Sequence, residues 1–404
     1  MGEGDPIATP GARVPAVARM SPPEAGRRVA VRSLRDRVQR LRAHALSRLE
    51  TLVMAESPSD DPALLGVVVR ELADAYATSG ARVERDQGPD ADHLVCHWPG
   101  RSPDADGHVL LIGHCDTVFP RGTAGRRPFR IAADGDTATG PGVYDMKGAL
   151  VAVEVAMLLL AEAGVPLRRA VRLVIVNDEE IGSPDGQRVV ATHADGAVAA
   201  LGLEPSLPGG GLKVGRRGVA RVEVRVAGRE AHAGVDAEQG VSAIDELIDH
   251  LITLRLLGPA IAVNVGTVAG GTRANVVAGH ARAEIGLRFA TAEAERSAWA
   301  AVESLTAVRA GAVVRTRTLS HRPVWTADPA NPLAVMLVDL AAGMGLRIAT
   351  GPALGAADTN LTGAQGIPTV DGLGPDGGGA HAAREHMSIR SMLDRAALLA
   401  ACLS

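Results

Sequence analysis

The stretch LIGHCDTVFP, residues 111–120, places a histidine, a cysteine and an aspartate side by side after an apolar run. The overlapping residues HVLLIG (108–113) have the composition of a buried strand, and side chains alternate between the two faces of a strand. His114 and Asp116 are therefore predicted to point to one side and Cys115 to the other. We expect the cysteine to pack as a small apolar residue, away from any site at this strand end.

Strands and helices alternate on either side of this stretch. The sequence predicts buried strands near 93–98, 108–113, 170–178 and 197–206, and helices at 27–48, 61–80, 146–164 and 331–345. The first of these helices is rich in arginine, which could indicate a nucleic-acid-binding arm, but its apolar residues recur at helical spacing and favour a helix with a solvated basic face. Continuous apolar strands between helices favour an α/β fold, with a mostly parallel sheet covered by helices on both faces.

The pattern changes near residues 209–218. VARVEVRVAG (219–228) alternates with period two, as a strand with one buried face should. A helix, two polar-alternating strands, a second helix and a strand are predicted to follow, at 240–257, 261–268, 279–290, 292–308 and 312–318. This β-α-β-β-α-β order predicts a small α+β sandwich inserted into the first domain. We expect a disordered extension over 1–30, a main domain formed by 31–213 and 326–404, and an inserted domain over 214–325.

Composition limits the class of protein. The chain has 404 residues, which is enough for two domains, and 46% apolar with 22% charged residues is typical of a globular protein. Its three cysteines lie far apart and form neither a disulfide framework nor a CxxC zinc site. The N-terminus lacks the apolar region of a secretory signal, so we expect a cytoplasmic location. The net charge of −4 argues against nucleic acid or an anionic membrane as the main partner.

Side chains that can bind metal follow several predicted strands, at the edge where open α/β sheets place their sites. Each acidic residue alone is more often a helix cap or a solvated loop residue. Together they supply a ligand set for one or two zinc ions, with a further carboxylate able to act as base to a bound water. They are His114 with Asp116, Asp145 in GPGVYDMKG, the pair Glu179 and Glu180 in VNDEEIGS, Glu204 in LGLEPS, and His381 in GGGAHAAREHM.

The motifs GHCDTVFP, GPGVYDMKG and NDEEIGS together resemble those of the dizinc metallopeptidase family that includes glutamate carboxypeptidase, aminoacylase, acetylornithine deacetylase and succinyl-diaminopimelate desuccinylase. The resemblance extends from about residue 60 to 404 in the order and spacing of the motifs, and it is nearest to the glutamate carboxypeptidase branch. It implies a zinc-exopeptidase-like domain with an inserted dimerisation domain, and therefore a homodimer. It also implies two Zn²⁺ per chain, with Co²⁺ or Mn²⁺ as substitutes, and a small peptide or N-acyl amino acid as substrate.

The resemblance also implies roles for particular residues. Asp145 would bridge both metals, with His114 and Glu204 completing one site and Glu180 and His381 the other.

Beyond the ligands, the resemblance makes Glu179 the general base and Asp116 the acid that orients the imidazole of His114. His232, in EAHAG, resembles a histidine that crosses the dimer interface to polarise the scissile carbonyl. The carboxylate end of the substrate would be bound by Asn275, Arg288 and Arg322.

The predicted function is that of a zinc-dependent hydrolase that cleaves an amide or peptide bond to an amino acid with a free α-carboxylate, including acidic C-terminal residues. A metal-activated hydroxide would attack, with Glu179 as general base. An N-acyl-amino-acid deacylase or a dipeptidase on the same scaffold is an alternative. A catalytically silent metal-binding protein is a further alternative, which the intact ligand set together with Glu179 disfavours.

Overall fold

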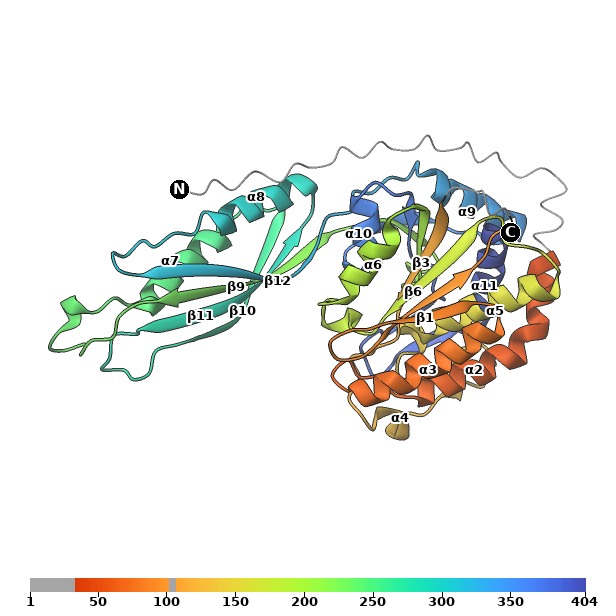
Figure 1. The fold of residues 1–404 in the computed structure, drawn as a ribbon, viewed down its shortest axis with the longest axis horizontal. Helices are drawn as coiled ribbons and strands as arrows, with labels where there is room; N and C mark the ends of the chain where they lie inside the picture. Colours follow the sequence, from red (N-terminus) through yellow and green to blue (C-terminus); the bar gives the residue numbers. More distant parts are fainter. Residues whose placement is uncertain (1–32, 102–106) are drawn as a thin grey trace.

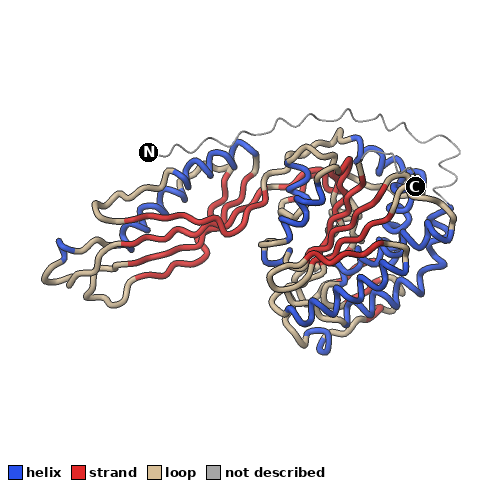
Figure 2. Tube along the Cα trace, viewed as in Figure 1, coloured by secondary structure: helices blue, strands red, loops and turns tan. Residues whose placement is uncertain are grey.

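A six-stranded sheet forms the centre of the larger domain in this computed structural model, which describes residues 33–101 and 107–404 (Figures 1 and 2). The strand order is β1-β2-β6-β3-β7-β14. The bounds are β1 (Arg82–Asp86), β2 (His93–Trp98), β3 (His108–His114), β6 (Ala170–Val176), β7 (Ala197–Gly202) and β14 (Thr369–Val370). β3 pairs in parallel with β6 and β7, and β7 with β14, whereas β1 and β2 form an antiparallel edge.

Helices cover both faces of this sheet because its strands bury side chains on both sides. Leu111 and Leu173 belong to one apolar core, and their neighbours Leu110 and Val174 belong to a second core on the opposite face. The first core includes α2 (Arg42–Met54), α3 (Pro62–Thr78), α5 (Gly148–Glu162), α9 (Pro332–Gly343) and α11 (Ile389–Leu403). The second is covered by α6 (Gly186–Ala194) and α10 (Thr359–Ala364). The predicted α/β fold with a mostly parallel sheet is confirmed.

The inserted part of the chain forms a second, antiparallel sheet that projects away from the first (Figure 1). Its elements are β9 (Gly218–Ala227), α7 (Ala243–Arg255), β10 (Ile261–Gly270), β11 (His280–Phe289), α8 (Ala292–Glu303) and β12 (Val313–Arg322), in the strand order β10-β11-β9-β12. Alternate residues of its strands form a core with both helices on one face, which the period-two pattern predicted. The predicted β-α-β-β-α-β order is confirmed, while the domain limits 214 and 325 stay a prediction.

The remaining described strands are short and mostly peripheral. They are β4 (Arg130–Ile131), β5 (Thr137–Thr139), β8 (Leu212–Arg216), β13 (Thr350–Ala353), β15 (Gly377–Gly378) and β16 (His386–Ser388), and the short helix α4 spans Thr123–Arg126. Edge strand β1 was not predicted, because its exposed polar residues lack an apolar run. The predicted disordered extension over 1–30 lies outside the described residues. None of the described helices combines the length and apolar composition needed to cross a membrane.

Candidate active site

The ends of three neighbouring strands bring the predicted metal-binding residues together. His114 is the last residue of β3, Glu179 and Glu180 lie in a 3₁₀ turn after β6, and Glu204 follows β7. Because β3 pairs in parallel with both β6 and β7, the carboxyl ends of these strands meet at one edge of the sheet. Cys115 is buried in the apolar core, as the alternation along the strand predicted.

Asp145 lies between two imidazoles. Its Oδ1 atom is 3.2 Å from Nε2 of His114, and its Oδ2 atom is 3.3 Å from Nε2 of His381. The same His381 nitrogen lies 3.0 Å from Oε2 of Glu180, while Nε2 of His114 lies 3.9 Å from Oε1 of Glu204. Potential ligand atoms of His114, Asp145 and Glu180 all lie within 4.8 Å of one another. The five residues therefore form one cluster with Asp145 at its centre.

This cluster has the chemistry of a divalent-metal site. Two imidazoles and three carboxylates are nitrogen and oxygen donors of the kind that zinc takes in proteins. Hydrogen bonds to Asp145 and Glu180 raise the pKa of His381 to about 10. Burial, and then the charge of Asp145, raise the pKa of Glu204 to about 7. The cluster thus favours added positive charge, which protons or metal cations can supply, and its residues fit one or two divalent ions.

Asp116 links His114 to the turn that carries the two glutamates. Its carboxylate accepts hydrogen bonds from the backbone N–H groups of Glu179 and Glu180, at 3.2 and 3.0 Å, and from the Ser59 hydroxyl at 2.7 Å. Nδ1 of His114 lies 3.0 Å from the Asp116 carbonyl oxygen and 3.3 Å from its Oδ1. Asp116 therefore fixes both the imidazole and the start of the turn.

Glu385 holds the turn that presents Asp145, a contact that sequence reasoning missed. Its buried carboxylate accepts hydrogen bonds from the backbone N–H groups of Gly142, Tyr144 and Asp145, at 2.8, 2.9 and 3.0 Å. The turn also explains why the predicted helix at 146–164 begins only at Gly148, since Asp145 itself has a non-helical backbone conformation. Nothing in the local sequence GGGAHAAREHM distinguishes Glu385 from a solvated loop residue, so it gave no signal for this support.

A buried ion pair lies next to Glu204, and it was not predicted from the sequence. Nη2 of Arg216 lies 3.8 Å from Oε2 of Glu204, while its Nε donates to Oδ2 of Asp371 at 2.8 Å. The Thr359 hydroxyl donates to the same Asp371 oxygen at 2.7 Å. Asp371 follows β14, so a strand distant in sequence fixes the arginine that faces Glu204. Arginine is so frequent in this chain that the sequence could not single this one out.

Glu179 is held by Arg322, which enters from the inserted sheet. Nη2 of Arg322 lies 2.8 Å from Oε1 of Glu179, and the guanidinium also contacts Asp358 at 3.0 Å and the Ser183 hydroxyl at 2.8 Å. Burial raises the pKa of Glu179 well above its ordinary value, and the charge of Arg322 opposes that shift. The Arg322 side chain is thus buried against residues of the larger domain.

The other residues predicted to contact substrate are spread along the inserted domain. Arg288 pairs with Val219 at the end of the sheet nearest the larger domain. His232 lies beyond the opposite end of β9, where it forms a bridge with Val276, and the carbonyl oxygen of Asn275 accepts a hydrogen bond from the neighbouring Ala233. Within one chain, the segments that carry His232 and Asn275 therefore follow the end of the inserted sheet that points away from the larger domain (Figure 1).

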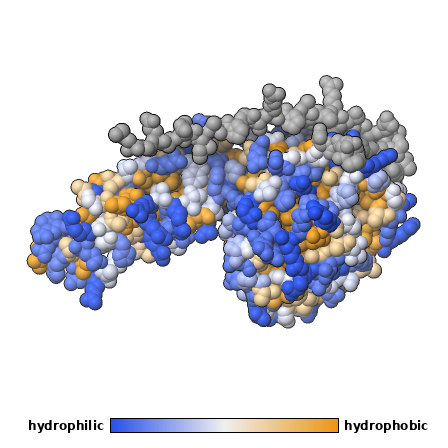
Figure 3. Space-filling view, viewed as in Figure 1, coloured by the Kyte–Doolittle hydropathy of each residue, from blue (hydrophilic) through white to orange (hydrophobic). Residues whose placement is uncertain are grey.

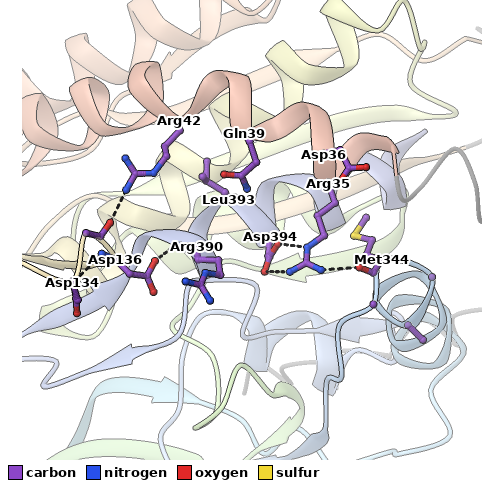
Figure 4. Close-up of a pocket in the computed structure, with 14 residues that line it drawn as sticks. Arg35, Asp36, Gln39, Arg42, Asp134, Asp136, Met344, Arg390, Leu393 and Asp394 are labelled. Atoms are coloured by element: carbon purple, nitrogen blue, oxygen red, sulfur yellow. Dashed lines mark hydrogen bonds and ion pairs between the residues drawn. The ribbon is translucent and has the colours of Figure 1, made fainter.

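Two cavities differ in their relation to this cluster. A small one, with about 10 Å³ of free space, is lined by His114, Glu179 and Glu204, and this space is about that of one water molecule. A larger one of about 770 Å³ lies away from the cluster, between α2, α9 and the start of α11 (Figure 4). Arg35 in its lining is already paired with Asp394, at 2.7 Å. The smaller cavity is therefore the one in contact with the cluster.

A cluster of two imidazoles and three carboxylates at the edge of an α/β sheet, beside a further, largely buried glutamate, is typical of metal-dependent hydrolases. Residues 110–404 match the model of peptidase family M20/M25/M40. The chain belongs to this family and is a metallohydrolase that acts on peptide or amide bonds.

Relatives with known names agree with this assignment. The chain is 27% identical over 372 residues to carboxypeptidase G2 of Pseudomonas sp. (strain RS-16), covering 89% of this chain and 88% of that one. It is 27% identical over 265 residues to succinyl-diaminopimelate desuccinylase of Beijerinckia indica, covering 61% of this chain and 68% of that enzyme. The predicted resemblance, nearest to the carboxypeptidase branch, is confirmed.

Solved structures support the fold. Aminopeptidase PepT from Bacillus cereus superposes with a TM-score of 0.70 at 22% identity, covering 90% of this chain and 98% of that one. The YXEP protein of Bacillus subtilis, described as a dinuclear metal binding peptidase from the M20 family, superposes with a TM-score of 0.63 at 17% identity, with coverages of 90% and 98%.

Proposed function

We propose that this protein is a zinc-dependent, carboxypeptidase-like hydrolase that releases an amino acid with a free α-carboxylate from a small peptide or an N-acyl amino acid. The observation that carries the proposal is the cluster of two imidazoles and three carboxylates around Asp145, with Glu179 beside it. The similarity to carboxypeptidase G2 along 89% of the chain supports this substrate class. Release of free amine from N-acyl glutamate by the zinc-loaded protein tests it, and a panel with other acyl groups and amino acids tests the deacylase and dipeptidase alternatives.

The five clustered side chains would hold two zinc ions, for which cobalt or manganese could substitute. Asp145 faces both imidazoles and is proposed to bridge the two ions. His114 and Glu204 would complete one site, and Glu180 and His381 the other. When bound, ions of this kind supply Lewis acidity that lowers the pKa of water toward neutrality.

Glu179 is proposed to take a proton from the attacking water and to transfer it to the departing amine. Three features support this role: the Glu179 side chain is largely buried, it lines the cavity with room for about one water, and Arg322 fixes one of its oxygens at 2.8 Å. Arg322 was expected to bind substrate. Its contacts with Glu179 and Asp358 support an additional role in orienting the base.

We further propose that the protein is a homodimer in which His232 and Asn275 act on the partner's site. Their place beyond the end of the inserted sheet that points away from the larger domain supports this arrangement. Helix α7 also presents an apolar stripe at helical spacing whose side chains are exposed to solvent, and the uncovered edge strand β10 belongs to the same domain. The stripe consists of Ile244, Ile248 and Ile252, and Leu256 extends it directly after the helix.

Mixing two inactive variants tests catalysis across subunits. His232→Ala and Glu179→Gln chains are each expected to have little activity alone. In a hybrid dimer, one site combines an intact Glu179 with an intact His232, so equal mixing should restore about a quarter of the native activity. Subunit exchange is verified by tagging one variant and isolating hybrids. Hybrids that stay inactive would exclude a role for His232 in the partner's site.

Amidation of the substrate tests recognition of the α-carboxylate. The guanidinium of Arg288 is exposed and can meet a carboxylate with two parallel hydrogen bonds. A charged hydrogen bond is worth about 1.5–3 kcal/mol, so amidating a good substrate should lower kcat/KM by about ten- to a hundredfold. Arg288→Ala should cost a similar factor.

The double change provides the control for this prediction. With Arg288 already replaced, amidation should do little further harm, because the partner of the carboxylate is gone. If the native protein cleaves amidated and free substrates equally well, the carboxypeptidase-like proposal fails and an aminopeptidase-type specificity becomes the better one.

A further inference from the structure

One face of the inserted sheet carries an excess of arginine. Helices α7 and α8 pack on the other face, through alternate residues such as Val222 and Ile285. Because directly paired residues of an antiparallel sheet point to the same side, the strand register identifies the side chains of the uncovered face. We call it the arginine face. Its charged side chains are Arg221, Arg225, Arg282, Arg288, Arg315, Arg317 and Arg322, with Glu223 and Glu284 as the acidic residues of the same face. Glu223 pairs with Arg225 and Arg317, Glu284 pairs with Arg221, and Arg322 pairs with Glu179 and Asp358 of the larger domain.

The far end of the arginine face holds three arginines in one row. Arg225 on β9 pairs directly with Arg282 on β11 and with Arg315 on β12. Like charges directly opposite each other destabilise a sheet. Arg225 has Glu223 as a partner, whereas Arg282 and Arg315 form no ion pair among residues 33–101 and 107–404. Such a row is expected to lower the stability of the sheet, and an anionic ligand would relieve its repulsion.

The near end of the same face reaches the candidate active site. Arg288 and Arg322 both pair with Val219, so they share a row, and Arg322 contacts Glu179 at 2.8 Å. Along β9, the row at Val219 and the row at Arg225 are six positions apart. Six positions of a strand correspond to about 20 Å. An extended peptide of about six residues has this length. In Figure 3 the inserted domain projects as an arm beside the larger domain, with an open corner between them.

We propose that the part of the arginine face beyond Arg288, with Arg282 and Arg315 at its far end, binds an acidic peptide segment of the substrate, on the acyl side of the bond that is cleaved. This inference rests on the proposed carboxypeptidase-like function, since it extends the same site along the arm. Nucleic acid fits less well. The face has no Phe, Tyr or Trp on which bases could stack, and the chain as a whole carries a net charge of −4.

Binding of an acidic peptide tests the arginine face without catalysis. The probe is fluorescein-labelled hexaglutamate with a C-terminal amide, which lacks the α-carboxylate that the proposed reaction needs. Fluorescence anisotropy with the zinc-loaded native protein should show salt-sensitive binding, and hexaglutamine should not bind. The double variant Arg282→Gln/Arg315→Gln should bind about five- to thirtyfold more weakly. Arg296→Gln, which removes an exposed arginine from α8 in the same domain, is the matched control and should bind like the native protein.

Two further readouts separate this inference from misfolding and from the proposed function. The double variant should melt no lower than the native protein, because it removes like-charge neighbours. It should lose the kcat/KM preference for glutamate-extended over glutamine-extended substrates, while an unextended substrate is cleaved as before. If the native protein cleaved neither extended nor unextended substrates, the proposed function would be refuted. The anisotropy measurement would still test whether the arginine face binds an acidic peptide. The inference would be overturned if Arg282→Gln/Arg315→Gln bound hexaglutamate as tightly as Arg296→Gln does. It would also be overturned if the native protein bound an oligothymidylate of equal charge more tightly than hexaglutamate.

Discussion

Asp145→Ala is expected to empty both metal sites, and activity should fall below detection. Asp145 is the cluster residue whose two carboxylate oxygens face different imidazoles, with Oδ1 3.2 Å from His114 and Oδ2 3.3 Å from His381. Removing a bridging ligand takes one donor from each site and leaves two protein ligands for each ion, which is fewer than the three of catalytic zinc sites. Metal analysis of protein purified without chelator should show about two equivalents in the native chain and almost none in the variant.

Glu204→Gln provides the contrast, because Glu204 approaches His114 but not His381, the other imidazole of the cluster, among the described ion pairs. This variant should lose about one equivalent of metal and keep the other. Circular dichroism and thermal melting should show both variants folded, since the turn that carries Asp145 is held by backbone hydrogen bonds to Glu385. If Asp145→Ala retained one full equivalent, the bridging assignment would be wrong.

The central elements of this protein could be predicted from local sequence signals. Apolar runs mark β3, β6 and β7, and polar residues follow each of them, so parallel pairing was sufficient to bring His114, Glu180 and Glu204 to one edge. Period-two alternation likewise identified β9 and the antiparallel sheet around it. These features depend on neighbours in sequence or on a general rule for sheets.

The supports of the site depend instead on contacts between distant segments. Glu385 receives three backbone N–H groups from the turn at Asp145, and Arg216 reaches Asp371 across 155 positions of sequence. Nothing in the local pattern distinguishes a buried arginine or glutamate from a solvated one. The contact of Arg322 with Glu179 shows the same limit, since the family resemblance implied only a substrate contact for this residue, which stays a prediction.

Glu179→Gln is expected to keep its metal and its fold and to lose turnover by about 10²- to 10⁴-fold, the usual contribution of a general acid–base group. Glutamine preserves the shape of the side chain and can still accept a hydrogen bond from Arg322, but its amide cannot take up a proton near neutrality. Glu179 has no contact with either imidazole of the cluster among the described ion pairs, whereas Oε2 of Glu180 lies 3.0 Å from His381. Metal content should therefore be unchanged.

Glu180→Gln is the matched control because it makes the same chemical change one residue along the same turn. It should lower metal content by about one equivalent, and added zinc should restore part of its activity, since a weakened site can be refilled by mass action. Excess zinc should do nothing for Glu179→Gln, in which a proton acceptor is missing. The two glutamates share a backbone turn and both N–H groups bind Asp116, so a general disturbance of the turn would affect both variants alike. Opposite responses to zinc therefore separate the base from the ligand, and exchanged phenotypes would reverse their assignment.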